Sequence, residues 1–145
     1  MDSADQHRDA ERMLALLREA GLKVTAQRAA LVQALAGDPS HPTAQELYER
    51  LQTTMPGMSF ATVYNTLASL ADAGLVTPRA LTQGAARFDP NTEPHDHAVC
   101  DRCGAVLDVP LSTTAFGPEP EPASPAGFSV RAVERVYRGL CARCH

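Results

Sequence analysis

The chain has 145 residues, a hydrophobic fraction of 44% and a formal net charge of −4 at pH 7. This length predicts one domain, or two small ones that share an interface. No apolar run approaches the roughly 18 residues of a membrane span, and the acidic N-terminus lacks a signal-peptide pattern, so we expect a cytoplasmic protein without a membrane partner. Residues 1–88 hold eight Lys and Arg against nine Asp and Glu, so binding to nucleic acid would require a local basic face.

Apolar periodicity and capping residues predict four helices in the first half of the chain. Gly21 ends the first helix, Thr25 and Ser59 cap the second and the fourth, and residues 43–46 form a capping box for the third. The expected helices are residues 8–20, 25–36, 43–55 and 59–73. Two short strand candidates follow at residues 75–81 and 85–89.

The fourth predicted helix separates an apolar stripe from a small, polar face. The stripe has spacings of three, four and three and consists of Phe60, Val63, Leu67 and Leu70. The outer face carries Ala61, Asn65 and Ala68, flanked by Thr62, Tyr64 and Ser69. Helices followed by a β-hairpin predict a winged helix, in which this helix would lie in the major groove. An ordinary core helix with a solvent face fits the same pattern.

The second half of the chain is predicted to be rich in β-structure. Residues 90–94 form a linker, and strand candidates follow at residues 95–99, 105–109 and 128–138. Residues 110–126 contain four prolines between 118 and 125, which predicts a loop rather than a helix. A sheet this small would be only marginally stable by itself. We therefore expect it to need a bound metal and a partner chain.

All four cysteines occur in CxxC pairs: Cys100 with Cys103, and Cys141 with Cys144. Two such pairs predict a tetrahedral four-thiolate zinc site of the structural kind, because each tight turn presents two thiolates to one ion. The alternatives are local disulfides or a thiol redox pair, which a reducing compartment and the surrounding sequence pattern disfavour.

A second metal site is indicated by His95 and His97, whose i, i+2 spacing puts both on one face of a strand. Candidate further ligands are His41, Asp89 and Asp108. Three imidazoles and two carboxylates suit a five-coordinate Fe(II) or Mn(II) ion. Such an ion would fix the two halves of the chain in one orientation. The alternative is that His95 and His97 are surface residues of a strand.

These motifs together resemble the ferric uptake regulator (Fur) family of bacterial metal-responsive repressors. The resemblance rests on residues 21–28, 41–44, 59–67 and 95–103 and on the terminal CxxC. It implies an α+β fold with a winged-helix DNA-binding domain at 1–89, a hinge at 90–94 and a small α/β dimerisation and metal-binding domain at 95–145. It also implies a homodimer on double-stranded operator DNA, with structural zinc and no small-molecule substrate.

Within this family the chain is most similar to the peroxide-sensing (PerR) branch. Asp89 and Asp108 stand where that branch has aspartates, and Asn65 follows the tyrosine of the recognition helix as it does there. The resemblance implies that peroxide oxidises His41 or His95 when iron is bound, after which the repressor loses metal and leaves DNA. Mn(II) in the same site would give a repressor that resists peroxide.

The DNA contacts that the resemblance implies lie at two places. The fourth helix supplies the base-contacting region, with Tyr64 and Asn65 and the neighbouring Ser59, Ala61 and Thr62. Lys23 and Arg28 match positions near phosphates or the minor groove, where cationic side chains anchor without reading sequence.

Two other functions stay open. One is a regulator that responds only to iron or manganese level. The other is a redox switch in which the cysteines oxidise and release zinc. An enzyme is not expected, because the sequence has no Ser/His/Asp arrangement, phosphate-binding loop or flavin motif.

Overall fold

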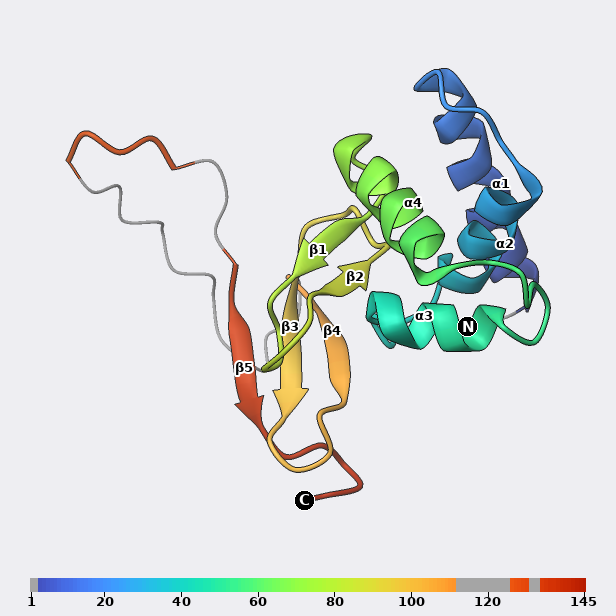
Figure 1. Cartoon of the computed structure of the whole chain (residues 1–145). Coiled ribbons are helices and arrows are strands. Elements are labelled where there is room, and N and C mark those ends of the chain that lie inside the picture. Colours follow the sequence, from blue (N-terminus) through green and yellow to red (C-terminus); the bar gives the residue numbers. More distant parts are fainter. Residues whose placement is uncertain (1–2, 112–125, 131–133) are drawn as a thin grey trace. The chain divides into compact units, whose positions relative to one another are not determined.

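A computed structural model of the chain describes residues 3–111, 126–130 and 134–145 and divides into two compact units, Met1–Thr92 and Glu93–His145. Figure 1 shows the helices and strands of both units. The first unit contains α1 (Ser3–Glu19), α2 (Ala26–Leu35), α3 (Ala44–Leu51), α4 (Phe60–Asp72), β1 (Thr77–Arg79) and β2 (Arg87–Asp89). The second contains β3 (His95–Cys100), β4 (Val106–Pro110) and β5 (Val136–Gly139).

Three predicted N-caps are confirmed. The side chains of Thr25, Thr43 and Ser59 each accept a hydrogen bond of 3.1 Å from the backbone N–H three residues later. Each bond satisfies one of the amide groups that a helix leaves unpaired at its start. Short-range chemistry therefore fixes where α2, α3 and α4 begin.

Helix α1 is longer than predicted, because it starts at Ser3 instead of residue 8. Its predicted end is correct. Gly21 has a φ of 80°, and the Leu22 N–H donates to the Leu17 carbonyl at 3.0 Å, which is a glycine-terminated Schellman turn.

The apolar stripe of α4 is confirmed at three of its four positions. Val63, Leu67 and Leu70 are fully buried, whereas Phe60 is 42% exposed. The prediction of a buried Phe60 is therefore wrong. Phe60 is the first residue of α4, where it packs edge-on against Tyr48 rather than into the core, with 5.8 Å between ring centroids.

Strands β1 and β2 form the antiparallel wing, shorter than predicted at both strands. Leu75 lies outside β1 because its N–H donates a hydrogen bond to the Leu70 carbonyl at 2.9 Å. This bond belongs to the turn that ends α4. An isolated antiparallel bridge also pairs Thr43, just before α3, with Arg87 of β2. The helices and this hairpin form a winged helix whose core is built from α1–α4 and the residues around the wing.

In the described residues of the second unit, three strands form a sheet in the order β4-β3-β5, with β3 antiparallel to β4 and parallel to β5. The predicted strand at 128–138 is corrected: residues 126–130 are not a strand, and β5 begins at Val136, where pairing with β3 begins. The predicted proline-rich loop lies outside the described residues except for residues 110, 111 and 126. In the described part of the chain, no helix is long and apolar enough to span a membrane.

We predict that Leu67→Ala lowers the free energy of unfolding by about 2–5 kcal/mol, because it opens a cavity among fully buried side chains. The measurement is urea unfolding followed by circular dichroism at a helical wavelength, since all the described helices lie in the first unit. Asn65→Ala, at an exposed position of the same helix, serves as the control and should change stability by less than about 0.5 kcal/mol. Equal losses in the two variants would contradict the assigned core.

Candidate metal centres and nucleic-acid interface

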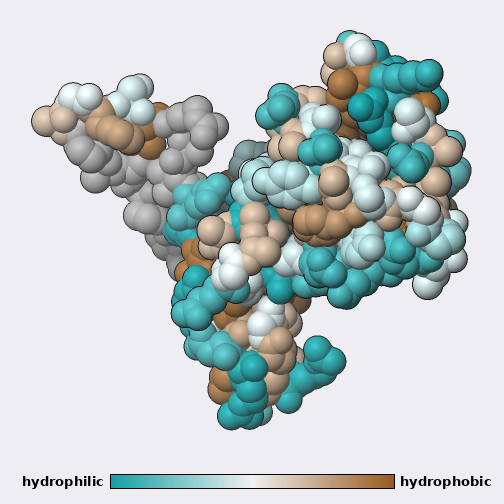
Figure 2. Space-filling model, viewed as in Figure 1, coloured by the Kyte–Doolittle hydropathy of each residue, from teal (hydrophilic) through white to brown (hydrophobic). Residues whose placement is uncertain are grey.

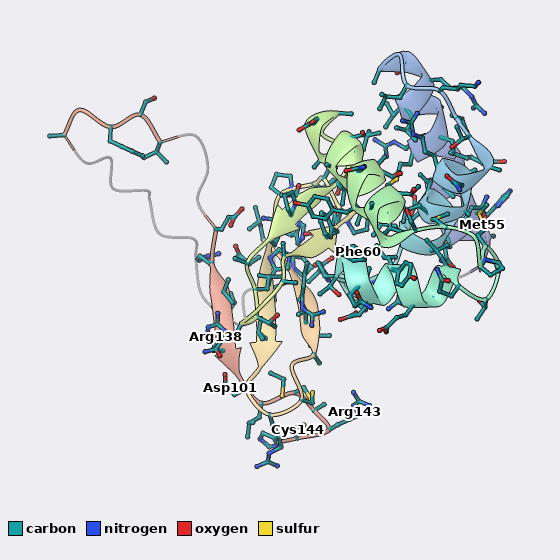
Figure 3. The ribbon with its side chains drawn as sticks, viewed as in Figure 1. Met55, Phe60, Asp101, Arg138, Arg143 and Cys144 are labelled. Atoms are coloured by element: carbon teal, nitrogen blue, oxygen red, sulfur yellow. The ribbon has the colours of Figure 1, made fainter. Side chains whose placement is uncertain are left out.

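The four cysteines come together at one end of the second unit. Cys100 ends β3, Cys103 follows in a tight turn, and Cys141 and Cys144 lie in a second turn just after β5. Their sulfur atoms all lie within 4.8 Å of one another and form no disulfide. Figure 3 shows the sulfur atoms gathered beside the labelled Cys144.

The spacing of these sulfur atoms fits a tetrahedral zinc ion. Four thiolates at the usual Zn–S distance are about 3.8 Å apart, and the Sγ atoms of Cys103 and Cys141 are 3.7 Å apart. The backbone joins the two turns as well, because the Asp101 N–H donates to the Gly139 carbonyl at 2.7 Å. The Arg102 guanidinium also donates to the Cys144 carbonyl at 3.1 Å.

The thiols of this cluster have unequal acidity. Backbone N–H groups of Cys103 and Cys141 donate to the Cys100 sulfur and lower its pKa to about 6. The neighbouring Cys141 thiol, together with burial, raises the pKa of Cys144 to about 12. Four thiolates this close repel one another, so the fully ionised cluster needs a cation between them.

A second group of ligand atoms lies in the same unit, on β3 and β4. Nε2 of His95 and Nε2 of His97 are 3.1 Å apart, which confirms that the two side chains share a face of β3. The Asp108 carboxylate, on β4, lies 3.2 Å from Nε2 of His95 and 3.5 Å from Nε2 of His97. The β3–β4 register places Asp108 directly opposite His97, which explains their proximity.

The first unit contains the other two predicted ligands, also next to each other. Nε2 of His41 lies 3.4 Å from the Asp89 carboxylate, and both side chains are buried. His41 has a φ of 52°, an unusual backbone conformation for a residue other than glycine. The Arg87 guanidinium holds the carbonyl of His41 at 3.1 Å.

The hydrogen bonds at two of the histidines select the tautomer that a metal requires. Nδ1 of His41 lies 2.6 Å from the Pro39 carbonyl, and Nδ1 of His95 lies 2.6 Å from the Glu93 carbonyl. A carbonyl can only accept, so Nδ1 carries the proton and donates it in each pair. The Nε2 lone pair is thereby left for a metal, the arrangement usual for histidine ligands.

The structure reveals a buried ion pair that the sequence did not predict. Asp96 lies between the two histidines of β3 and points to the other side of the strand, where its carboxylate is 2.7 Å from Nη2 of Arg135. Asp96 is 3% exposed, so it is not a solvated residue. The pair ties β3 to the residue just before β5.

The residues expected to contact DNA occupy two places in the first unit. Tyr64 and Asn65 are exposed on α4, and Tyr64 stacks on Phe60 with ring centroids 6.5 Å apart. Figure 2 shows a hydrophobic area on this face, at the place where Figure 3 labels Phe60. At the start of α2, the Arg28 guanidinium donates to the Lys23 carbonyl at 2.6 Å, so these two cationic residues are neighbours.

The remaining three candidates lie in the first turn of α4 or next to it. Ser59 and Ala61 are exposed and Thr62 is half-buried. Ser59 serves as the helix cap, and its hydroxyl lies 3.0 Å from the hydroxyl of Thr62. Both hydroxyls are therefore engaged in holding the helix N-terminus.

A winged helix combined with a four-cysteine cluster and histidine–carboxylate groups defines a metal-binding protein with a nucleic-acid-binding fold. Residues 19–117 match the ferric uptake regulator family. Because this match covers more than half of the chain, the protein belongs to that family.

One similar protein is the peroxide-responsive repressor PerR of Staphylococcus epidermidis, which is 41% identical over 98 residues. The match covers 68% of this chain and 65% of that protein, so the chain matches just under two thirds of this relative's length.

Solved structures give the same fold. A PerR structure from Streptococcus pyogenes, described as a basis for peroxide sensing and gene regulation, has a TM-score of 0.54 and 27% identity, covering 94% of this chain and 93% of that one. A ferric uptake regulator from Pseudomonas aeruginosa with manganese has a TM-score of 0.63 and 26% identity, covering 90% and 98%.

We predict that the full-length protein retains about one zinc ion per chain on its four thiolates and that Cys103→Ser loses it. Because zinc binding is coupled to folding of so small a unit, the variant should also melt at a lower temperature. Metal analysis after dialysis and calorimetry measure both effects. His95→Ala is the matched control, since it leaves the thiolates intact, and full zinc retention by Cys103→Ser would contradict the assignment.

Proposed function

We propose that this protein is a homodimeric, metal-dependent transcriptional repressor that senses peroxide through a regulatory Fe(II) or Mn(II) ion. In this proposal, the ion takes ligands from both units: His41 and Asp89 from the first, and His95, His97 and Asp108 from the second. A structural zinc ion would occupy Cys100, Cys103, Cys141 and Cys144. The observation that carries the proposal is the orientation of His41 and His95, whose Nε2 atoms face carboxylates while Nδ1 is held by the backbone.

The donor set favours Fe(II) or Mn(II) over a second zinc ion. Three imidazole nitrogens and two carboxylate oxygens are harder ligands than thiolates, and five such ligands exceed the four that zinc usually takes in proteins. An ion bound to both groups would hold the two units in one relative orientation. Metal would then select the conformation that binds DNA, which couples metal binding to repression.

The proposed peroxide sensing depends on an oxidisable imidazole that is a ligand of the ion. Fe(II) bound by these residues would supply the chemistry that activates peroxide. The imidazole of His41 or His95 would then gain one oxygen atom from peroxide, and the other oxygen would leave as water. Because an oxidised ring is a poorer ligand, the repressor would lose its metal and release DNA. The peroxide-responsive relative described above supports this assignment.

DNA binding is assigned to α4 and the start of α2. The exposed Tyr64 and Asn65 suit contacts with base edges, and Lys23 with Arg28 suits contacts with phosphates. The net charge of −4 does not attract DNA in general, so we expect weak non-specific binding and a strong dependence on bound metal. The second unit is proposed to join two chains through its sheet, which exposes Leu107, Val136 and Leu140 on or near its strands.

The peroxide assignment is tested by mass spectrometry with peptide mapping on Fe(II)-loaded protein before and after a brief peroxide pulse. We expect a gain of one oxygen atom on the peptide containing His41 or His95. The Mn(II)-loaded protein is the control and should stay unmodified. If neither form is modified, the peroxide assignment is wrong and the protein is a regulator that responds only to metal level. Cysteine oxidation with loss of zinc would instead favour the redox switch at the four cysteines.

The DNA assignment is tested with a duplex selected from a random library by the Mn(II)-loaded protein. Tyr64→Ala should weaken binding to the selected duplex about 5- to 150-fold, the range for one lost base contact, with little effect on a scrambled duplex. Lys23→Ala should weaken binding to both, because phosphate contacts carry no sequence information. Fluorescence anisotropy measures each affinity, and an unchanged affinity in Tyr64→Ala would remove α4 from the interface.

A further inference from the structure

The two carboxylate oxygens of Asp89 have different partners. Oδ1 lies 3.4 Å from Nε2 of His41 and accepts a hydrogen bond from the Asn91 N–H at 3.0 Å. Oδ2 accepts a hydrogen bond from Nε of Arg79 at 2.9 Å. Asp89 is completely buried. The oxygen that faces the imidazole is therefore the one that a metal ion would take, and the other is held by a cation of the protein itself.

The wing explains why Arg79 reaches this carboxylate. Arg79 lies on β1 directly opposite Arg87 of β2, and Asp89 is two residues further along β2. Diagonal neighbours of this kind share a face of the hairpin and are within reach of a long side chain. The Arg79 side chain is 12% exposed, so the guanidinium and the carboxylate compensate each other largely out of water.

We propose that Arg79 is an internal counter-cation that sets the metal concentration at which the regulatory site fills. It neutralises Asp89 when the metal is absent and opposes the charge of the ion when the metal is bound. This inference rests on the proposed function, because it requires Asp89 to be a metal ligand. Arg79 is a positioning and tuning residue and is not itself a ligand.

Two effects act in the same direction on metal affinity. In the metal-free protein Arg79 stabilises the carboxylate, and this stabilisation is weakened when an ion takes over the negative charge. In the metal-bound protein the fixed guanidinium repels the ion. Both effects are strong because Asp89 is buried, whereas the Asp108 side chain is 31% exposed and is better screened by water.

The test measures Mn(II) affinity of the full-length, zinc-loaded protein from the electron paramagnetic resonance signal of free Mn(II). Removing the charge in Arg79→Leu or Arg79→Gln should tighten Mn(II) binding about tenfold or more, the size of the effect of a neighbouring charge on a carboxylate. Arg79→Lys should restore an affinity close to that of the wild type. Arg18→Leu removes an exposed arginine of α1 as the matched control and should change nothing.

A second readout does not depend on bound metal. Without Mn(II), Arg79→Leu should melt about 5 °C or more below the wild type, because it leaves a buried carboxylate uncompensated. Mn(II) should restore more of the melting temperature in this variant than in the wild type. If Arg79→Leu does not fold, the Mn(II) affinity of Arg79→Gln is the deciding measurement. Its amide can donate a hydrogen bond to Asp89 but carries no charge.

The outcomes separate this inference from the proposed function. The role of Arg79 as a counter-cation is overturned if folded Arg79→Leu and Arg79→Gln bind Mn(II) no more tightly than the wild type does. This conclusion requires that Asp89→Asn weakens Mn(II) binding, as the loss of a ligand should. If Asp89→Asn binds Mn(II) as the wild type does, the proposed ligand set is wrong and the role of Arg79 is overturned with it.

Discussion

Negative charges that are buried or held close together need a cation beside them, and this constraint applies both to the cysteine cluster and to Asp89. The four sulfur atoms come within 4.8 Å of one another at the ends of two turns. In the first unit, the buried Asp89 carboxylate is held by Arg79, which does for this carboxylate what a metal would do for the thiolates. Because the second unit is small, we expect its stability to depend on a metal ion bound in this cluster.

The wing of the first unit has two roles that meet at Asp89. As a hairpin it completes the winged helix, and as a scaffold it brings Arg79, Asp89 and the backbone around His41 together. The strained backbone at His41 is supported by hydrogen bonds at its ring and at its carbonyl. If His41 and Asp89 bind a metal ion as proposed, this fixed geometry would reduce the ordering that binding requires.

In the second unit, the residue between the two histidines performs a separate task. Alternation along β3 sends His95 and His97 to one face and Asp96 to the other. Asp96 pairs with Arg135 there and fastens β3 to the start of β5. The same strand therefore presents the two candidate ligands on one face and is anchored on the other, which keeps the imidazoles in place.

The sequence alone determined the features that depend on neighbours in the chain. The caps at Thr25, Thr43 and Ser59, the glycine stop of α1 and the two CxxC turns follow from local chemistry, and so does the shared face of His95 and His97. Tertiary structure decided the rest. Phe60 packs against Tyr48 of α3 and stays partly exposed, and this placement depends on how α3 and α4 meet. The Arg79–Asp89 and Asp96–Arg135 pairs depend on strand register and on contacts between distant segments, which no local pattern specifies.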